Sequence, residues 1–373
     1  MFTEPMKIAL VVPGGVDRSG EYRVVPALLA LIRRLARVHD VHVFALSQEP
    51  APGTWRLEGA YVHNIGARQT RLRAVRAILR EHRARPFDVV HSIWSGASGT
   101  VAVTAAGLLR LPSLIHVAGV ELIALPDIAC GGRLRWRGRL REAMNLRGAS
   151  MITAASSPMV QSVASLGCTA VRVPLGVDSD TWPPRPPHRR AGTGPARLIH
   201  VASLNAVKDQ QTLLRAMAVL AAAGIDFRLD IVGEDTLGGK LQVLSQELGL
   251  ASRVRFLGFQ TRRQLRPLVE SADLLVVSSR HEAGPMAVLE AAALGVPTVG
   301  TCVGHIAEWA PSAAVSVGIG DWNELAASVR RLVEDEELRL RVARQAWQRA
   351  TAEDADYTAS RFQALYGELV GAG

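Results

Sequence analysis

Short apolar runs alternate with segments of helical spacing along almost the whole chain of 373 residues, and this alternation limits the folds open to it. Strands that alternate with helices form parallel sheets, because parallel neighbours need long crossover connections. We therefore expect an α/β fold. Strand-like runs lie at 8–12, 41–45, 89–91, 114–117, 151–154, 171–173, 197–202, 228–232, 254–257, 274–278, 298–300 and 314–317. Helical spacing occurs at 24–37, 72–83, 209–223, 239–248, 262–270, 286–294, 322–349 and 356–369.

A proline-rich segment divides this alternation in two. Four prolines follow Trp182 within a few residues, and no helix or inner strand tolerates so many. A chain of this length is typical of two domains. The predicted organisation is a first domain at 1–182, a linker at 183–194 and a second domain at 195–355.

Composition excludes several classes of protein. Hydrophobic residues make up 48% of the chain, which is enough for sizeable cores, but no apolar run reaches the ~18–20 residues that span a bilayer. The three cysteines, Cys130, Cys168 and Cys302, are odd in number and far apart, so neither a disulfide framework nor a metal site is expected. The first residues read as a strand rather than as a signal peptide. We expect a cytoplasmic protein.

The formal net charge of +9 lies entirely in the first half of the chain. Residues 1–180 contain 22 Lys and Arg against 13 Asp and Glu, whereas residues 181–373 contain 21 of each. Most of the excess comes from Arg68–Arg85 and Arg133–Arg147. Aromatic residues are few in these segments and no nucleic-acid-binding motif is present, so nucleic acid is not an expected partner.

Both basic segments also carry apolar residues at helical spacing. In the first, Leu72, Val75 and Leu79 can share one helix face. In the second, apolar residues that include Trp136 and Met144 interleave with arginines. A basic amphipathic helix can lie on an anionic membrane surface or attract an acidic substrate. A solvated helix face is the simpler alternative for either segment, and both interpretations stay open.

The segment 278–297 carries the strongest functional signal. Its two carboxylates, Glu282 and Glu290, have seven residues between them, and a helix begins after Pro285. The free N–H groups of Met286 and Ala287 would form an anion site suited to a phosphate. Glu290 lies in an apolar run, where a carboxylate is costly to bury unless it is paired or functional. Carboxylates on either side of a phosphate could bind the hydroxyls of a sugar nucleotide.

This segment resembles the Glu-x7-Glu signature of the retaining family 4 glycosyltransferases, which have the GT-B fold. That resemblance implies two Rossmann-like α/β domains facing a central cleft, with the terminal helix, 356–373, packing back on the first domain. It implies transfer of a sugar from a nucleotide-sugar donor to a glycan, lipid-linked or small-molecule acceptor, as in polysaccharide biosynthesis. The residues that match are Ser279, Glu282, Gly284, Pro285, Glu290, Ala291, Gly295 and Pro297.

Other segments extend the resemblance to most of the chain. The loop with Gly14 and Gly15 follows the first strand and is similar to the family's glycine loop, although a tight turn would look the same. Lys208 matches the family lysine that neutralises the leaving diphosphate, but Ser203 stands where an arginine is usual. Ser203 and Asn205 could donate neutral hydrogen bonds instead. The remaining donor-binding residues implied by the family are Gly233, Leu257, Ala283, Gly284, Pro285, Met286 and Ala287.

One histidine has an open role. Many family members carry His-Gly-x-Asp near the reacting sugar, and matching Gly119 and Glu121 places Ala118 at the histidine position. His116 lies two residues earlier, on the same face of the strand. It could substitute as a catalytic residue or could be a core histidine.

The implied mechanism assigns Glu290 to the ribose hydroxyls, Glu282 to the donor sugar and Lys208 to the departing diphosphate. Electrostatic stabilisation of that leaving group would be the main catalytic contribution. No metal ion and no cofactor are expected. A nucleotide-sugar epimerase of the same fold, or a non-enzymatic binder of anionic lipid or nucleic acid that uses the basic half, are the alternatives. A glycosidase is disfavoured, because a phosphate-binding helix start does not serve its two-carboxylate chemistry.

Overall fold

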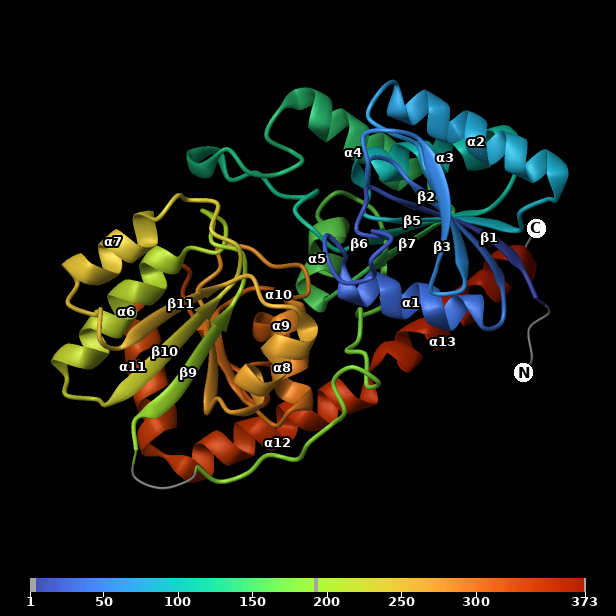
Figure 1. The fold of residues 1–373 in the computed structure, drawn as a ribbon. Helices are drawn as coiled ribbons and strands as arrows, with labels where there is room; N and C mark the ends of the chain where they lie inside the picture. The colour runs from blue at the N-terminus through green and yellow to red at the C-terminus, as the bar shows by residue number, and fades with distance from the viewer. Residues whose placement is uncertain (1–4, 191–193, 372–373) are drawn as a thin grey trace. The chain divides into compact units, whose positions relative to one another are not determined.

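The computed structural model describes residues 5–190 and 194–371 and divides into two compact α/β units (Figure 1). Unit 1 comprises the described residues up to Gly176 together with those from Ala355 onward, and unit 2 comprises the described part of Val177–Asp354. Each unit has its own sheet with helices on both faces.

The sheet of unit 1 is parallel except for one edge hairpin. Its strands are ordered β3-β4-β2-β1-β5-β6-β7-β8, and only β3 runs antiparallel to its neighbour. Successive residues of β1 point to opposite faces: Ile8 and Leu10 enter one apolar core, and Ala9 enters the other. The strand bounds are β1 Lys7–Val12, β2 Asp40–Ala45, β3 Gly53–Leu57, β4 Ala60–Asn64, β5 Val89–Ile93, β6 Ser113–Val117, β7 Met151–Ala154 and β8 Val171–Arg172.

Helices cover both faces of this sheet. α1 (Pro26–Ala36) and α13 (Ala355–Gly371) pack on one face, and α2 (Thr70–Ala84) and α3 (Gly96–Leu109) pack on the other. The remaining helices are α4 (Trp136–Gly148), which contacts α3, α5 (Ser157–Ala164) and the 3-10 turn Pro126–Ile128.

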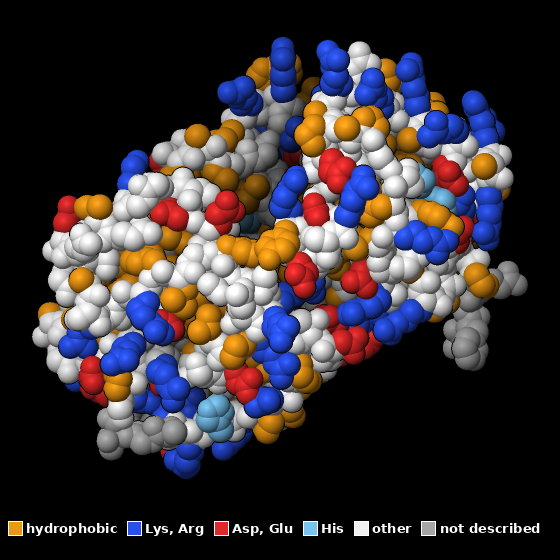
Figure 2. Space-filling model, in the orientation of Figure 1, with side chains coloured by type: hydrophobic (Ala, Val, Ile, Leu, Met, Phe, Trp, Pro, Cys, Tyr) orange, Lys and Arg blue, Asp and Glu red, His pale blue; other side chains and the backbone are white. Residues whose placement is uncertain are grey.

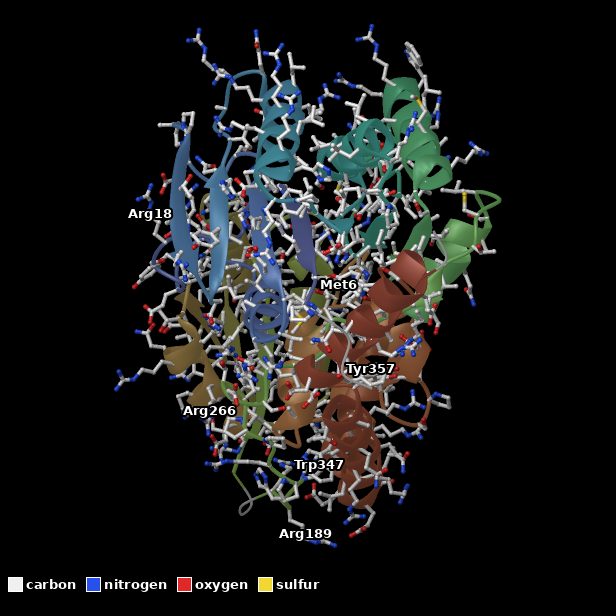
Figure 3. All side chains as sticks on the ribbon, turned by 90° about the vertical axis from the view of Figure 1, so that its right-hand side faces the viewer. Met6, Arg18, Arg189, Arg266, Trp347 and Tyr357 are labelled. Atoms are coloured by element: carbon white, nitrogen blue, oxygen red, sulfur yellow. The ribbon has the colours of Figure 1, made fainter. Side chains whose placement is uncertain are left out.

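The terminal helix is part of unit 1. Phe362 and Tyr366 of α13 are fully buried in the core beneath β1. The Asp356 carboxylate accepts a hydrogen bond of 2.7 Å from the Arg34 guanidinium on α1. Tyr357, at the start of the same helix, is labelled in Figure 3.

Unit 2 has a parallel sheet with the strand order β11-β10-β9-β12-β13-β14. α6, α7 and α11 cover one face, and α8, α9, α10 and α12 cover the other. The strands are β9 Ala196–Val201, β10 Phe227–Val232, β11 Val254–Gly258, β12 Leu274–Val277, β13 Thr298–Thr301 and β14 Val315–Val317. The helices are α6 Gln210–Ala222, α7 Lys240–Glu247, α8 Arg262–Glu270, α9 Met286–Ala293, α10 Gly304–Trp309, α11 Trp322–Glu334 and α12 Glu336–Ala352.

The structure differs from the predicted elements at several places, and it adds the helices α3, α5 and α10, which were not predicted. The hairpin β3–β4 was not predicted, because its strands are short and half exposed. The predicted helix 322–349 is two helices, since Asp335 ends α11 and its carboxylate caps α12 by accepting a hydrogen bond from the Leu338 N–H. On α2, Leu72 is exposed, and the buried face instead holds Ala74, Val75 and Ile78.

The proline-rich segment packs onto unit 2. Trp182 is buried in one of the cores of unit 2, and the Arg185 N–H donates to the Ala293 carbonyl at the end of α9. Gly295 has φ +73 and leaves room for Pro187, whose Cα would lie 2.7 Å from a Cβ at that position. Residues 183–190 of the predicted linker are therefore a packed strap, and 191–193 lie outside the described residues.

Two expectations from composition can be compared with the structure. Cys130, Cys168 and Cys302 are all free thiols. Among the helices of residues 5–190 and 194–371, none combines the length and the apolar character that crossing a bilayer requires.

Candidate active site

The candidate site of unit 2 lies where β9 and β12 end. β9 continues to β10 and β11 on one side of the sheet, and β12 lies on its other side, so the strand order reverses between β9 and β12. Ligands of parallel α/β sheets bind beyond the carboxyl ends of the strands at such a reversal. The loops that leave these two strands, 202–209 and 278–285, carry the predicted residues Ser203, Asn205, Lys208 and Glu282–Pro285.

A buried ion pair joins the two loops. The Lys208 Nζ lies 2.6 Å from the Glu282 Oε1, and the Ser279 hydroxyl donates to the same oxygen at 2.7 Å. The side chains of Lys208 and Glu282 are 26% and 11% exposed. The pair is therefore accessible to a ligand while each charge is partly shielded from water.

Hydrogen bonds fix the backbone on both sides of this pair. The Asn205 Oδ1 accepts from the N–H groups of Val207 and Lys208, at 3.0 and 3.1 Å. The Lys208 carbonyl accepts from the Ser278 hydroxyl, and the Arg280 N–H donates to the Val207 carbonyl. The side-chain oxygen of Asn205 thus shapes the loop that presents Lys208, and its donating role toward a ligand, which would use the amide NH2 group, stays a prediction.

Helix α9 begins immediately after the Glu282 loop, with Pro285 as its N-cap residue. The structure gives this helix start no side-chain cap within the described residues. Its first N–H groups, Met286 and Ala287, are consequently available to an anion. Gly304, with φ +48, allows the next helix to approach, because a Cβ there would lie 2.9 Å from the Pro285 Cδ.

Glu290 is a buried carboxylate about one turn into α9. Only 7% of the residue is exposed, and no hydrogen bond reaches its carboxylate from residues 5–190 or 194–371. Burial raises the pKa of Glu290 to about 7, opposed by the charge of Arg262. A buried polar group without a partner points to a ligand that supplies one.

The other donor-side residues take distinct positions. Gly233, with φ +152, lets the end of β10 approach β9, because a Cβ there would lie 1.9 Å from the Ala202 carbonyl oxygen. Ser203 is exposed. The Leu257 carbonyl accepts from the Gln260 side chain at 2.8 Å, so the predicted backbone contact to a base is partly occupied. Ala283 and Gly284 complete the loop between Glu282 and Pro285.

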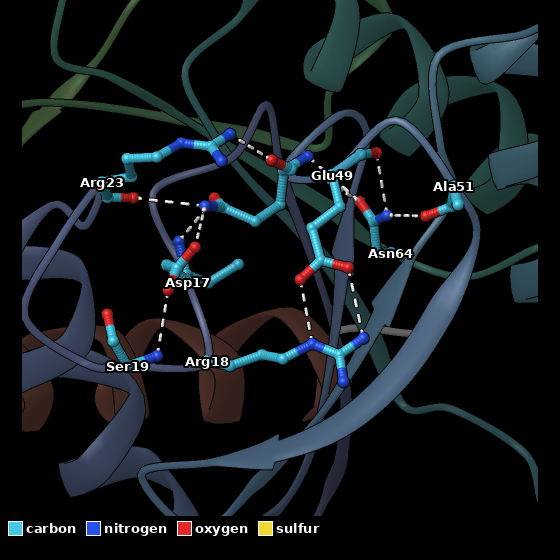
Figure 4. A network of polar contacts seen from close by, with 9 residues as sticks. Asp17, Arg18, Ser19, Arg23, Glu49, Ala51 and Asn64 are labelled. Atoms are coloured by element: carbon cyan, nitrogen blue, oxygen red, sulfur yellow. Dashed lines mark hydrogen bonds and ion pairs between the residues drawn. The ribbon is translucent and has the colours of Figure 1, made fainter.

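In unit 1, the predicted glycine loop is held by a side chain that sequence inspection did not single out. Figure 4 shows the polar network beside this loop, with Asp17, Arg23 and Asn64 labelled. The Gln48 Oε1 accepts from the N–H groups of Gly15 and Val16 at 2.7 and 3.0 Å. A Cβ at Gly14 would lie 3.2 Å from that oxygen, and Gly15 has φ +83. Both glycines are thus required by the turn itself, and the Gly15 N–H is already bonded to Gln48.

His116 lies inside the sheet of unit 1. It is 0% exposed, its Nδ1 lies 2.9 Å from the Thr153 hydroxyl, and its ring packs edge-on against Phe362. Burial lowers its pKa to about 3. Of the two roles left open, full burial and these contacts favour that of a core histidine, and the catalytic role stays an untested prediction.

Comparison with known proteins identifies the family. Residues 186–349 match the family model described as glycosyl transferases group 1, and residues 24–176 match the glycosyl transferase 4-like domain. The D-inositol 3-phosphate glycosyltransferase of Corynebacterium jeikeium is 30% identical over 310 residues, covering 77% of this chain and 74% of that protein. The chain is a family 4 glycosyltransferase.

Solved structures place this glycosyltransferase in the GT-B fold. Sucrose-phosphate synthase from Thermosynechococcus elongatus matches with a TM-score of 0.83 and 18% identity, over 99% of this chain and 100% of that chain. Anabaena HepE in complex with UDP-glucose matches with a TM-score of 0.73 and 18% identity, over 98% and 100%. Two α/β domains with parallel, Rossmann-like sheets are the shared architecture.

The loops after β5 and β6 of the glycosyltransferase are joined by a second buried carboxylate. The Glu121 Oε1 accepts from the N–H groups of Ala118 and Ser95, at 3.2 and 3.4 Å. Burial raises the pKa of Glu121 to about 7, and the nearby carboxylate of Glu142 adds to the rise. Gly119 has no space for a side chain, because a Cβ would lie 2.7 Å from the Glu121 Oε2.

His200 connects the two strands, β9 and β12, that end at the candidate site of the glycosyltransferase. Its Nδ1 donates to the Val276 carbonyl at 2.8 Å, so it joins β9 to β12, and its Nε2 accepts from the Gln210 amide. Burial lowers its pKa to about 4, which keeps the ring neutral. The sequence signal was a polar residue in an apolar strand, which by itself does not separate a supporting histidine from a core one.

Proposed function

We propose that this glycosyltransferase transfers a sugar from a nucleotide-sugar donor with retention of the anomeric configuration. The observation that carries the proposal is Glu290, which is 7% exposed, has a pKa raised by burial, and lies about one turn into a helix that follows the Lys208–Glu282 ion pair. A ribose supplies hydroxyl donors for Glu290, and a diphosphate supplies negative charge for the helix start and Lys208. The complex of Anabaena HepE with UDP-glucose supports a donor of this class.

Each part of the site has a proposed task. Lys208 leaves its ion pair with Glu282 and binds the diphosphate, whose negative charge grows as the glycosidic bond breaks. Ser279 keeps the released Glu282 carboxylate oriented toward the donor sugar. The departing phosphate oxygen accepts the proton of the acceptor hydroxyl, so the chemistry needs neither a separate general base nor a metal ion.

A donor screen tests this proposal. Nucleotide sugars of uridine, guanosine and adenosine are mixed with the protein, thermal unfolding is followed, and hydrolysis or transfer products are detected by mass spectrometry. We expect one donor class to raise Tm, since a ligand that binds only the folded state at 100 times its Kd stabilises it by about 2.7 kcal/mol. If no nucleotide sugar raises Tm or yields product, the proposal is wrong.

We propose further that the enzyme works as a peripheral protein at the cytoplasmic face of a membrane, on a glycan or lipid-linked acceptor. α4 supports this, because Trp136, Leu140 and Met144 repeat every fourth residue and are 62%, 53% and 64% exposed. Lys and Arg side chains gather along the upper edge of the view in Figure 2, over α2 and α4. Apolar side chains that insert between basic ones are typical of interfacial helices.

A vesicle assay tests the membrane proposal. Trp136, Leu140 and Met144 are replaced together by alanine, with Val243→Ala and Ile319→Ala on exposed sites of unit 2 as the control. We expect the wild type and the control to sediment with phosphatidylcholine vesicles that contain phosphatidylglycerol. The triple variant should bind at least about 10-fold more weakly, because three inserted apolar side chains are lost. Equal sedimentation of all three proteins would contradict the proposal.

A further inference from the structure

Three possible metal ligands meet in unit 1, on the outer strands of the sheet. They are His42 on β2, His63 on β4 and Glu81 on α2, and their ligand atoms all lie within 4.8 Å of one another. The His42 Nδ1 lies 2.9 Å from the His63 Nε2 and 3.7 Å from the Glu81 Oε1. His42 is buried and the other two are partly exposed.

A carboxylate on the far side of His42 fixes which of its nitrogens faces the cluster. The His42 Nε2 lies 3.4 Å from the Asp40 Oδ1, so this nitrogen carries the proton and the Nδ1 presents its lone pair. The His63 Nε2–H then donates to that lone pair. Histidines that bind metals are oriented in this way, by a carboxylate on the non-ligating nitrogen.

Both imidazoles are neutral, as metal binding requires. Burial lowers the pKa of His63 to about 4, and the neighbouring His42 lowers it further. Burial also lowers the pKa of His42, with the charge of Lys7 acting in the same direction. When an ion binds, the His63 proton moves from Nε2 to Nδ1, so that both facing nitrogens present lone pairs to the ion.

We propose that His42 Nδ1, His63 Nε2 and the Glu81 carboxylate form a site for a transition-metal ion of the Zn²⁺ class. Two histidines and one glutamate are a known zinc ligand set, with Zn–N bonds of about 2.0–2.1 Å. Tetrahedral bonds of that length separate the two nitrogens by about 3.3 Å. The present separation of 2.9 Å must widen only by a few tenths of an ångström.

The fourth position of the ion faces a pocket of about 630 Å³ that is lined by His63 and Glu81. Arg73, Arg76 and Arg80 of α2 line the same pocket. The arginines lower the affinity for any cation, whereas the two imidazole nitrogens disfavour Mg²⁺ and Ca²⁺, which are held by oxygen ligands, and favour ions that bond to nitrogen. The arginines can also hold an anion, such as phosphate or a carboxylate, on the open position of the metal.

Lys7 already forms an ion pair with the Glu81 carboxylate, which the metal ion would also bind. Its Nζ lies 2.9 Å from the Glu81 Oε1 and donates to the Arg85 carbonyl. A metal ion therefore competes with Lys7 for Glu81, and this competition lowers the affinity of the site for the ion. Lys7 does not compete for the two imidazole nitrogens. The other oxygen of the Glu81 carboxylate allows it to contact both cations.

Equilibrium dialysis of the full chain, purified without a histidine tag, against Zn²⁺ tests the site. We expect one ion per chain and a dissociation constant at least about 100-fold higher for His63→Gln, since the loss of a ligand exceeds the 10- to 100-fold cost of losing an outer partner. Asp40→Asn should show that smaller cost. His188→Ala, at an exposed histidine of unit 2, is the matched control and should bind as the wild type does.

Substitution with Co²⁺ gives a second readout that does not depend on affinity. A tetrahedral site with nitrogen and oxygen ligands gives the bound Co²⁺ strong visible absorption, which His63→Gln and Glu81→Gln should each abolish. Glu81→Gln keeps the assay informative if His63→Gln fails to fold. The proposal is overturned if the wild type binds no Zn²⁺, or if the Zn²⁺ affinity and Co²⁺ spectrum of the folded variants equal those of the wild type.

Discussion

Replacement of Lys208 by alanine is expected to lower kcat by about 10²–10³-fold, which is the effect of removing one preorganised group that stabilises developing negative charge. Lys208 lies at the reversal of strand order, 2.6 Å from Glu282 and beside the start of α9. Because Ser203 is neutral where an arginine is usual, Lys208 should carry more of this task alone. Steady-state kinetics with the donor found in the screen measures the effect.

Lys240 provides the matched control for this variant. It is an exposed lysine at the start of α7 in the same unit, so Lys240→Ala removes the same charge from the same domain away from the site. We expect Lys240→Ala to keep wild-type kcat and Glu282→Asp to lower it less than Lys208→Ala does. Near-normal turnover of Lys208→Ala would remove Lys208 from the mechanism.

The convergence of Lys208 and Glu282 could be predicted only in part. Each residue follows an apolar run that reads plainly as a strand, and the carboxyl ends of parallel strands share one edge. What the chain order does not disclose is that β12 pairs with β9 rather than with β11, its predecessor in sequence. The resemblance to the family supplied that adjacency, and periodicity alone would have left the two loops unconnected.

The cluster of His42, His63 and Glu81, in contrast, could not be predicted from the sequence. The cluster forms because β2 pairs with β4, which places Phe44 opposite His63. Because β4 is short and partly exposed, it was not predicted, and no sequence spacing relates two histidines 21 residues apart to a glutamate on a helix. Sequence spacing therefore does not disclose a group of possible metal ligands that an unpredicted strand brings together.

Side-chain partners were the least predictable feature of the site. The spacing of α2 placed Leu72, Val75 and Leu79 on one helix face, whereas Val75 is buried together with Ala74 and Ile78 and Leu72 is 50% exposed. Asn205 was predicted as a donor to the ligand, and its additional role of accepting hydrogen bonds within the Lys208 loop was not predicted. Such outcomes depend on tertiary neighbours, which alternation and helical spacing do not encode.

Replacement of Glu290 by glutamine is expected to have two opposite effects. KM for the donor should rise by about 10- to 100-fold, because hydrogen bonds to a charged group contribute about 1.5–3 kcal/mol. Glu247→Gln, at an exposed glutamate of α7, is the control and should leave KM unchanged. The same substitution should stabilise the folded protein at alkaline pH, since it removes a buried carboxylate without a partner.

The pH dependence separates this stabilisation from a general effect of the substitution. The pKa of Glu290 is about 7 in the folded protein and 4.5 for the ordinary group, so the folded state binds more protons and stability falls as pH rises through this window. Below pH 4.5 the burial of Glu290 does not lower the stability, and above pH 7 the loss of stability is complete. Glu290→Gln has no carboxylate at this position and therefore lacks this loss of stability. The pKa of Glu121 is also raised by burial, but Glu121 is present in both proteins and cancels in the comparison. The stability difference between variant and wild type should therefore grow by about 1–3 kcal/mol from pH 5 to pH 8, measured by chemical denaturation without donor.

A difference that is constant across this range would mean that Glu290 is not held in a desolvating site, and would remove the strongest physical reason for assigning it to a ligand.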